Sequence, residues 1–157
     1  MVKPKSTSRF SSIKKPVILA QTDTTVGFAS QDYTQLSTIK SRPSSKPFIK
    51  IFSNFTTFSD DRNRVPHSQK SFVRRSKKTT FIVGNNAFRI NSLKKNSQVQ
   101  RDMDYYYSTS ANEKSKSFER VFCEQKADII IEDKNGLCEN ISSTLIKINN
   151  KRKRKIR

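Results

Sequence analysis

The 157-residue sequence is poor in the side chains from which most metal and nucleophilic sites are built. It contains one histidine, His67, and two cysteines, Cys123 and Cys138, which lie fifteen residues apart. This spacing fits neither a zinc-ligand pair nor a redox CxxC motif. His67 follows Pro66 in a polar segment, so we expect it on the surface and not in a catalytic triad. The sequence therefore argues against a protein-bound metal and against hydrolysis by a serine or cysteine nucleophile.

Long apolar runs are also missing. No stretch approaches the roughly 18 to 20 consecutive apolar residues of a membrane-spanning helix. The first fifteen residues lack the apolar segment of a signal peptide. We therefore predict a cytoplasmic protein without a membrane partner, in which both cysteines are reduced and Cys123 is a small core side chain.

Acidic residues are absent from a long part of the chain. Between Arg62 and Arg101 there is no Asp or Glu, against eleven Lys or Arg, and the whole chain has a net charge of +19. A field of this sign attracts polyanions, first of all nucleic acid and nucleotide phosphates. Solubility and helix-dipole complementation would explain part of this charge. We predict RNA, such as tRNA, as a partner, contacted by Arg74, Arg75, Lys77, Lys78, Arg152, Lys153 and Arg154.

The length fits one domain with a single modest core. Residues 1–15 hold five basic residues and no acidic one, which predicts a disordered basic arm. Residues 151–157 hold six basic residues among seven and are predicted to be a basic tail. The domain itself is expected over residues 16–150.

Hydrophobic periodicity predicts alternating strands and helices. Strands are expected at residues 17–20, 48–52, 79–83, 87–90, 105–108, 127–131 and 144–148. Helices or helical turns are expected at 33–39 after the cap Asp32, at 54–61, at 66–76, within 91–101, and at 118–126 after the cap Ser117. The sequence Gly-Asn-Asn at 84–86 predicts a hairpin turn. This alternation is typical of an α/β domain with a twisted, mixed sheet.

Polar side chains follow the first predicted strand in the segment QTDTTVGF, residues 21–28. In α/β sheets, ligands collect outside the carboxyl ends of the strands, so such a segment suits a binding site. Gly27 permits either a sharp turn or a close approach of another chain segment. An ordinary turn is the alternative, because Asp, Thr and Gly are common turn residues.

Four motifs, in the same order, resemble those of the YrdC-like, threonylcarbamoyl-AMP synthase family. QTDTTVGF is similar to the family's PTDTxYGL, and IKSRPSSKP at 39–47 is similar to its KxRxxxKP. YYYSTSAN at 105–112 and ISSTLIKI at 141–148 resemble its STSAN and SSTxxD segments. The resemblance implies a single YrdC-like domain, with helices flanking a twisted mixed sheet and a positively charged concave surface.

The resemblance also implies an activity, the condensation of L-threonine, bicarbonate and ATP to threonylcarbamoyl-adenylate for tRNA modification. The implied catalytic residues are Lys40, Arg42, Ser110 and Asn112. The implied substrate-binding residues are Thr22, Thr24, Arg89 and Thr109, and the implied nucleotide-binding residues are Ser142, Ser143 and Thr144. Magnesium is expected to accompany ATP, held mainly by phosphate and water.

The sequence departs from the family pattern at several positions. Gln21 replaces a proline and Val26 replaces a tyrosine, which we expect to remove a ring from the pocket. A WPGP segment is replaced by residues 75–78, and the glycine of SANxSG is lost. Three functions stay open: a compact synthase, a non-catalytic YrdC-like module that binds double-stranded RNA or tRNA, and a basic structural protein of a ribonucleoprotein. The retained motifs favour the first two, and of these we favour the enzyme.

Overall fold

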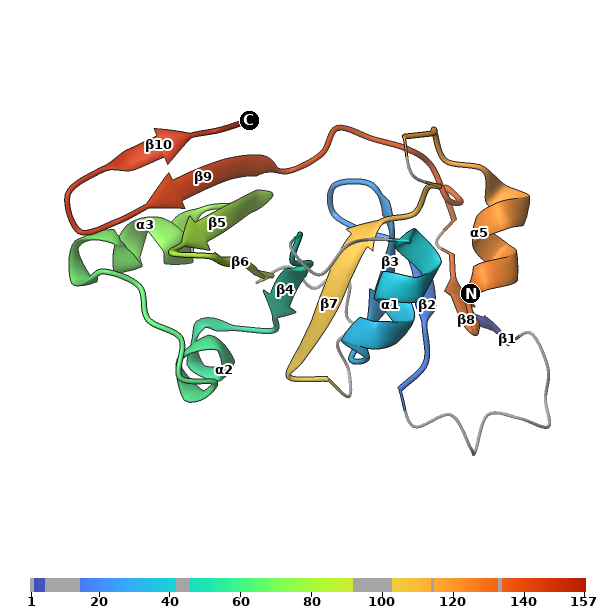
Figure 1. Cartoon of the computed structure of the whole chain (residues 1–157), viewed down its shortest axis with the longest axis horizontal. Coiled ribbons are helices and arrows are strands. Elements are labelled where there is room, and N and C mark those ends of the chain that lie inside the picture. The colour runs from blue at the N-terminus through green and yellow to red at the C-terminus, as the bar shows by residue number, and fades with distance from the viewer. Residues whose placement is uncertain (1, 5–14, 42–45, 92–102, 114, 133) are drawn as a thin grey trace.

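The computed structural model describes residues 2–4, 15–41, 46–91, 103–113, 115–132 and 134–157. Within these residues the strands form one mixed sheet in the order β1-β8-β2-β3-β7-β4-β6-β5-β9-β10 (Figure 1). The strands are β1 (Val2–Pro4), β2 (Ile18–Gln21), β3 (Val26–Ser30), β4 (Ile49–Phe52), β5 (Thr79–Val83), β6 (Asn86–Ile90), β7 (Tyr105–Ser110), β8 (Ile129–Ile131), β9 (Thr144–Ile148) and β10 (Lys153–Lys155). The predicted α/β class with a mixed sheet is confirmed.

Short helices flank the sheet. They are α1 (Tyr33–Lys40), α2 (Phe55–Asp60), the 3-10 helix η2 (His67–Gln69), α3 (Lys70–Arg75) and α5 (Arg120–Lys126). Helix α1 begins where the sequence predicts, because the Asp32 carboxylate accepts hydrogen bonds from the backbone N–H groups of Thr34 and Gln35. Figure 1 shows α1 and α5 at the end of the molecule that holds β2 and β8, and α2 and α3 at the opposite end. None of the described helices is long and apolar enough to cross a bilayer.

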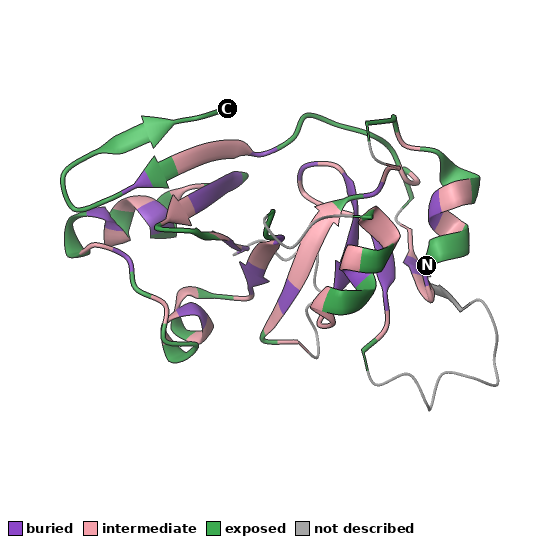
Figure 2. Cartoon of the chain, in the orientation of Figure 1, coloured by how far each residue is buried: buried purple, intermediate pink, exposed green. Residues whose placement is uncertain are grey.

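The helices cover one face of the sheet. Leu36 of α1 and Cys123 of α5 pack with Phe28 of β3 in one core cluster. A second cluster joins Phe58 of α2 and Val73 of α3 to aromatic strand residues Phe52, Phe81 and Phe88. Since successive strand side chains point to opposite faces, the neighbours of these aromatic residues face away from the helices. Figure 2 shows buried positions along β2, β3 and β5, whereas β10 at the edge is exposed.

The other face of the sheet is apolar near β2 and carries both polar and apolar side chains elsewhere. Ile18, Ala20 and Ala29 form a third cluster there with Ile51 and Tyr106. The same face carries Arg89 and the serines of β7. This face, which the described helices leave uncovered, is where the candidate site lies.

Several expectations about the first half of the chain need correction. Residues 26–30 form β3, which pairs antiparallel with β2, so residues 22–25 form a hairpin turn and not an open strand end. Strand β7 continues to Ser110, so the STSAN segment begins inside the sheet. The predicted β5–β6 hairpin is confirmed, with Gly84 at a φ of 59°. The expected helical segment at 91–101 lies almost wholly outside the described residues.

The second half of the chain holds further differences. Helix α5 begins at Arg120 after Glu119, without a side-chain cap, and Val121 is 62% exposed and not part of its buried face. Strand β8 spans only three residues and is half-buried, where we expected a strand buried on both faces. Strand β9 is not the final strand, because residues 153–155 of the predicted tail form β10 along it. Residues 2–4 of the predicted arm form β1, which pairs antiparallel with β8.

Candidate functional site

A cavity of about 470 Å³ lies on the helix-free face of the sheet. Its volume is in the range of small-molecule binding sites. Eight lining residues carry hydroxyl groups, namely Thr22, Thr24, Thr25, Ser108, Thr109, Ser110, Ser142 and Ser143. Three cations, Lys46, Arg89 and Arg157, also line it, and an apolar wall is made by Pro47, Ile49, Ile51, Ile82, Ala87 and Leu145. No lining residue is acidic, so the cavity suits an anion that also presents hydrogen-bonding groups.

The β2–β3 turn brings its threonines to the cavity. The Thr22 hydroxyl donates to the carbonyl of Thr25 at 2.6 Å and accepts from the backbone N–H groups of Thr24 and Thr25 at 3.2 Å. Thr22 is therefore both a turn residue and a lining residue. The two interpretations of this segment from the sequence, an ordinary turn and part of a binding site, are therefore compatible.

Arg89 is a buried centre of the site. Its Nη1 donates to Asp23 Oδ1 at 2.9 Å, and these side chains are only 6% and 4% exposed. Its Nε and Nη2 donate to the Thr80 hydroxyl, which is 2.9 Å from the Ser143 hydroxyl. One side chain thus connects the β2–β3 turn, β5 and the segment before β9. Asp23 was not predicted as a site residue, although its position inside the TDT motif is a signal that could have identified it.

Lys40, Ser110 and Asn112 come together, as the resemblance implies. The Lys40 ammonium donates to the Ser110 carbonyl at 3.2 Å and to the Asn112 carbonyl and Oδ1 at 2.5 and 2.8 Å. The Ser110 hydroxyl donates to Asn112 Oδ1 at 2.7 Å. Of the three, only Ser110 lines the cavity. In this structure, Lys40 and Asn112 fix the end of β7 beside the cavity.

Gly27 permits a close approach of two strands. A Cβ atom at this position would lie 3.0 Å from the Thr109 carbonyl oxygen of β7. Any side chain would therefore push β3 away from the strand that carries Thr109 and Ser110. Of the two roles considered for Gly27, the close approach is the observed one.

Two cations of the cavity were missed as site residues. Lys46 lies in the KxRxxxKP-like segment, which was a usable signal. Arg157 lies in the predicted tail, where the surrounding lysines and arginines conceal any pattern. Its Nε and Nη2 each lie 3.3 Å from the Ser143 carbonyl, and its backbone carbonyl accepts from the Leu145 N–H.

The remaining predicted residues fall into separate groups. Thr144 lies in β9 and does not line the cavity, and Arg42 is outside the described residues. The predicted RNA-contacting residues do not line it either; they lie near the end of α3 and around β10. Val26 packs in the helix-side core cluster and does not line the cavity. The expectation that valine in place of the family's tyrosine removes a ring from the pocket is therefore wrong in this fold. Within the described ranges, no cluster of three or more His, Cys, Asp or Glu side chains could hold a metal ion.

Comparison with known proteins supports the fold. No family model matches the sequence, and no curated protein matches it. Among solved structures, Sua5 from P. abyssi is similar, with a TM-score of 0.71 at 17% identity, and the match covers 90% of this chain and 52% of that one. Its complex with L-threonine gives a TM-score of 0.70, again at 17% identity, covering 90% of this chain and 50% of that one. The chain thus spans about half of the length of Sua5.

A shorter protein gives a fuller match. The solution structure of MTH1692 from Methanobacterium thermoautotrophicum is similar with a TM-score of 0.62 at 17% identity, covering 90% of this chain and 79% of that one. Each of these likenesses covers 90% of the chain. The chain therefore has the YrdC-like fold.

Proposed function

We propose that this protein is a threonylcarbamoyl-AMP synthase-like enzyme of the cytoplasm, which uses the cavity to join L-threonine, bicarbonate and ATP for tRNA modification. The observation that carries the proposal is the cavity lining, in which the QTDT, STSAN and SST segments meet around hydroxyls and cations without a carboxylate. The fold agrees with this proposal, since a similar structure is a complex of Sua5 with L-threonine.

The chemistry requires positioning more than a nucleophile. The threonine amine forms a bond to the bicarbonate carbon and water leaves. An oxygen of the resulting carbamate then bonds to the α-phosphorus of ATP, and pyrophosphate leaves. All three reactants bring negative charge, so the site must hold them together with fixed cations and neutral donors. The lining supplies both kinds of group.

Roles follow from the contacts. Arg157 and Lys46 are the cations that can meet phosphate oxygens, with Ser142 and Ser143 beside Arg157. Ser108 and Ser110 face the reactants from β7, and Thr109 between them also lines the cavity. Arg89, already paired with Asp23, positions the surrounding segments. Arg42 keeps the anion-binding role that the family resemblance implies. When ATP is bound it brings magnesium, which phosphate and water would hold because the lining has no carboxylate.

The test is a measurement of pyrophosphate release from ATP, with threonine and bicarbonate present together or withheld one at a time. We expect release only when both are present. The variant Arg157→Gln should lower kcat/KM for ATP about 10-fold to 150-fold, because one charge-assisted hydrogen bond contributes roughly 1.5 to 3 kcal/mol. Arg154→Gln is the matched control, since Arg154 is exposed on β10, three residues before Arg157, and does not line the cavity. Release independent of threonine, or none in the unsubstituted protein, would overturn the proposal.

A second candidate is a non-catalytic YrdC-like module that binds RNA. Exposed cations of α3 and β10 favour it. Calorimetry separates the two candidates, because a module without synthesis would bind tRNA but neither threonine nor ATP.

A further inference from the structure

An irregular segment between β8 and β9 passes beside the β2–β3 turn, and we call its residues 137–140 the strap. Figure 1 shows the chain running from the end of the molecule that holds α5 across to β9. The Cys138 N–H donates to Gln21 Oε1 at 2.9 Å, and the Cys138 carbonyl accepts from the Val26 N–H at 3.2 Å. Leu137 packs against the helix-side core cluster. The strap forms neither helix nor strand, so these contacts determine where it lies.

Thr25 joins the strap to the cavity, which it lines. Its N–H donates to the Thr22 hydroxyl at 3.2 Å, and its carbonyl accepts from the same hydroxyl at 2.6 Å. Its own hydroxyl oxygen accepts from the Asn140 N–H of the strap at 3.1 Å. A threonine hydroxyl can also donate one hydrogen bond, and in the part of the chain that the structure describes the Thr25 hydroxyl donates none. One donor is therefore left for a ligand.

Other hydroxyl groups of the lining are engaged within the protein or are not held in place. The Thr22 and Ser110 hydroxyls donate to protein oxygens at 2.6 and 2.7 Å. The Ser143 hydroxyl shares a hydrogen bond with a hydroxyl of β5. Ser142 is exposed, and its hydroxyl has no hydrogen bond within the described residues. Thr25 combines a free donor with a fixed oxygen, and a group that is fixed before binding loses less entropy when a ligand arrives.

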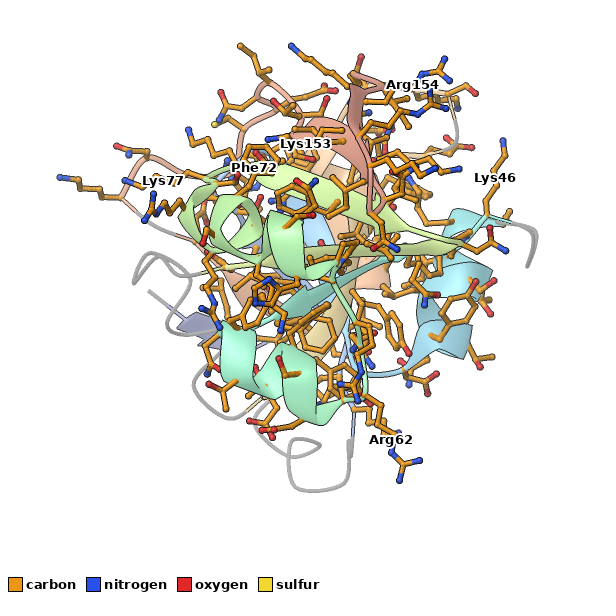
Figure 3. All side chains as sticks on the ribbon, turned by 90° about the vertical axis from the view of Figure 1, so that its left-hand side faces the viewer. Lys46, Arg62, Phe72, Lys77, Lys153 and Arg154 are labelled. Carbon is orange, nitrogen blue, oxygen red and sulfur yellow. The ribbon has the colours of Figure 1, made fainter. Side chains whose placement is uncertain are left out.

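The chain after the strap is held separately. Strand β9 pairs with β5 on one side and with β10 on the other. The Lys153 ammonium of β10 lies 4.2 Å from the centre of the Phe72 ring, and Figure 3 shows Lys153 beside Phe72 of α3. Two residues separate the strap from Ser143, which lines the cavity. We therefore expect loss of the Gln21 contact to loosen the strap while β9 stays in place.

We propose that Thr25 binds the ligand of the cavity by donating a hydrogen bond to an anionic oxygen, and that Gln21 positions Thr25 by holding the strap. Thr25 stands at the variable position of the pattern PTDTxYGL, and Gln21 stands where that pattern has proline, so neither role is implied by the resemblance. That the oxygen belongs to the carboxylate of L-threonine or to a phosphate of ATP rests on the proposed function. The free donor itself does not.

The ligand contact is tested by calorimetry with L-threonine, ATP and adenosine. Thr25→Val keeps the shape of the side chain without the hydroxyl, whereas Thr25→Ser keeps the hydroxyl. We expect Thr25→Val to raise one Kd roughly 10-fold to 150-fold, because a hydrogen bond to a charged oxygen is lost, and Thr25→Ser to stay within about threefold. A rise for L-threonine assigns the oxygen to its carboxylate, and a rise for ATP but not for adenosine assigns it to a phosphate.

The strap is tested separately, by hydrogen–deuterium exchange of residues 137–143. Gln21→Met keeps the length of the side chain but has no acceptor for the Cys138 N–H, so exchange should be faster. Gln21→Glu retains an acceptor and should keep exchange slow. Gln31→Met is the matched control, because it removes a glutamine contact to the Tyr105 carbonyl and neither of these residues lines the cavity. The control should leave exchange of the strap and each Kd unchanged.

Gln21→Met should also raise the Kd that Thr25→Val raises, but only about twofold to tenfold, since the Thr25 hydroxyl is displaced and not removed. Circular dichroism checks that each variant is folded. The proposal is wrong if Thr25→Val changes no Kd or raises all three equally, if Thr25→Ser is impaired as much as Thr25→Val, or if exchange is unchanged in Gln21→Met. Binding without pyrophosphate release would contradict the proposed function alone, whereas no binding of either L-threonine or ATP would contradict both.

Discussion

At the scale of single residues, the ion pair of Arg89 and Asp23 dominates the site. It is the most buried pair among those of the described residues, with both side chains less than a tenth exposed. Removing one partner of such a pair leaves a charge without water or a counter-ion, which costs far more than losing a surface pair. The pair thus links the shape of the cavity to the stability of the sheet.

We predict that Asp23→Asn and Arg89→Gln each lower the free energy of unfolding by about 3 to 5 kcal/mol, because each leaves one buried charge unpaired. The double variant should be more stable than the sum of the single losses predicts. Urea unfolding followed by circular dichroism measures all three. Losses below about 1 kcal/mol, or strictly additive losses, would contradict this assignment.

The two cysteines should differ in reactivity. Burial raises the pKa of the Cys123 thiol, and the hydrogen bond with Glu119 and the charge of Lys40 only partly offset this effect. Cys123 therefore carries little thiolate near neutral pH, while Cys138 is exposed. Iodoacetamide added to the native protein should modify Cys138 alone, and both residues should react in urea. Mass spectrometry of the peptides checks this, and equal labelling in the native protein would refute it.

At the scale of elements, local signals decided which predictions succeeded. Helix α1 and the β5–β6 hairpin carry their own cap and turn residues, so they could be located from the sequence. Strand β3 contains Gly27 and follows a run of hydroxyls, a composition typical of a turn, and only pairing with β2 and β7 makes it a strand. Strand β10 consists of lysine and arginine, and the backbone of β9 stabilises it. Such tertiary pairing leaves no periodic pattern.

The residues of the candidate site also differ in whether the sequence alone could identify them. The motif segments around Thr24, Ser110 and Ser143 could be named from resemblance, and the structure brings them to one cavity. Arg157 could not be found in this way, because only the pairing of β10 with β9 brings the residues after β10 to the cavity. Asp23 and Gly27 lie within a recognised motif. The ion pair of Asp23 with Arg89 and the proximity of Gly27 to Thr109, however, depend on the fold.

The cap of α1 gives a pH-dependent prediction. Burial raises the pKa of Asp32, but hydrogen bonds from Gln35 and Thr34 outweigh this, so the pKa is lowered below its usual value of 3.8. The carboxylate therefore stabilises the folded state above pH 3.8, and this contribution is lost as the pH falls through the lowered pKa. Asp32→Asn keeps a good cap without titrating, whereas Asp32→Ala should cost about 1 kcal/mol.

The stability difference between the unsubstituted protein and Asp32→Asn should be full at pH 6 and should shrink as the pH falls below 3.8. Urea unfolding of both proteins across this range provides the measurement. Parallel stability curves at all pH values would show that the charge of Asp32 contributes nothing to the cap.

At the scale of the whole molecule, unbalanced charge is the leading feature. The chain has a net charge of +19, and many of the described cations lie at the end that holds α3 and β10, where like charges repel one another. Such self-repulsion destabilises a compact state. Salt at 0.1 M weakens the repulsion between exposed charges that are more than about 10 Å apart. We predict that raising sodium chloride from about 0.02 M to about 0.3 M raises Tm, by roughly 2 to 4 °C for each kcal/mol gained. A fall in Tm would show that the attractive ion pairs outweigh the repulsion.

The parallel pairings of the sheet also determine how the molecule must assemble. Ile18 pairs with Ile129, and Thr79 pairs with Thr144, so both contacts close very long loops. Chains dominated by such distant contacts fold slowly, because the loop-closure entropy is lost before the contacts form. Until β9 pairs with β5, the edge of β5 with its apolar sequence TTFIV can pair with other chains. Until then Ser143 and Arg157 also do not line the cavity. Aggregation during refolding and late recovery of ligand binding therefore have the same cause, which is the slow pairing of β9 with β5.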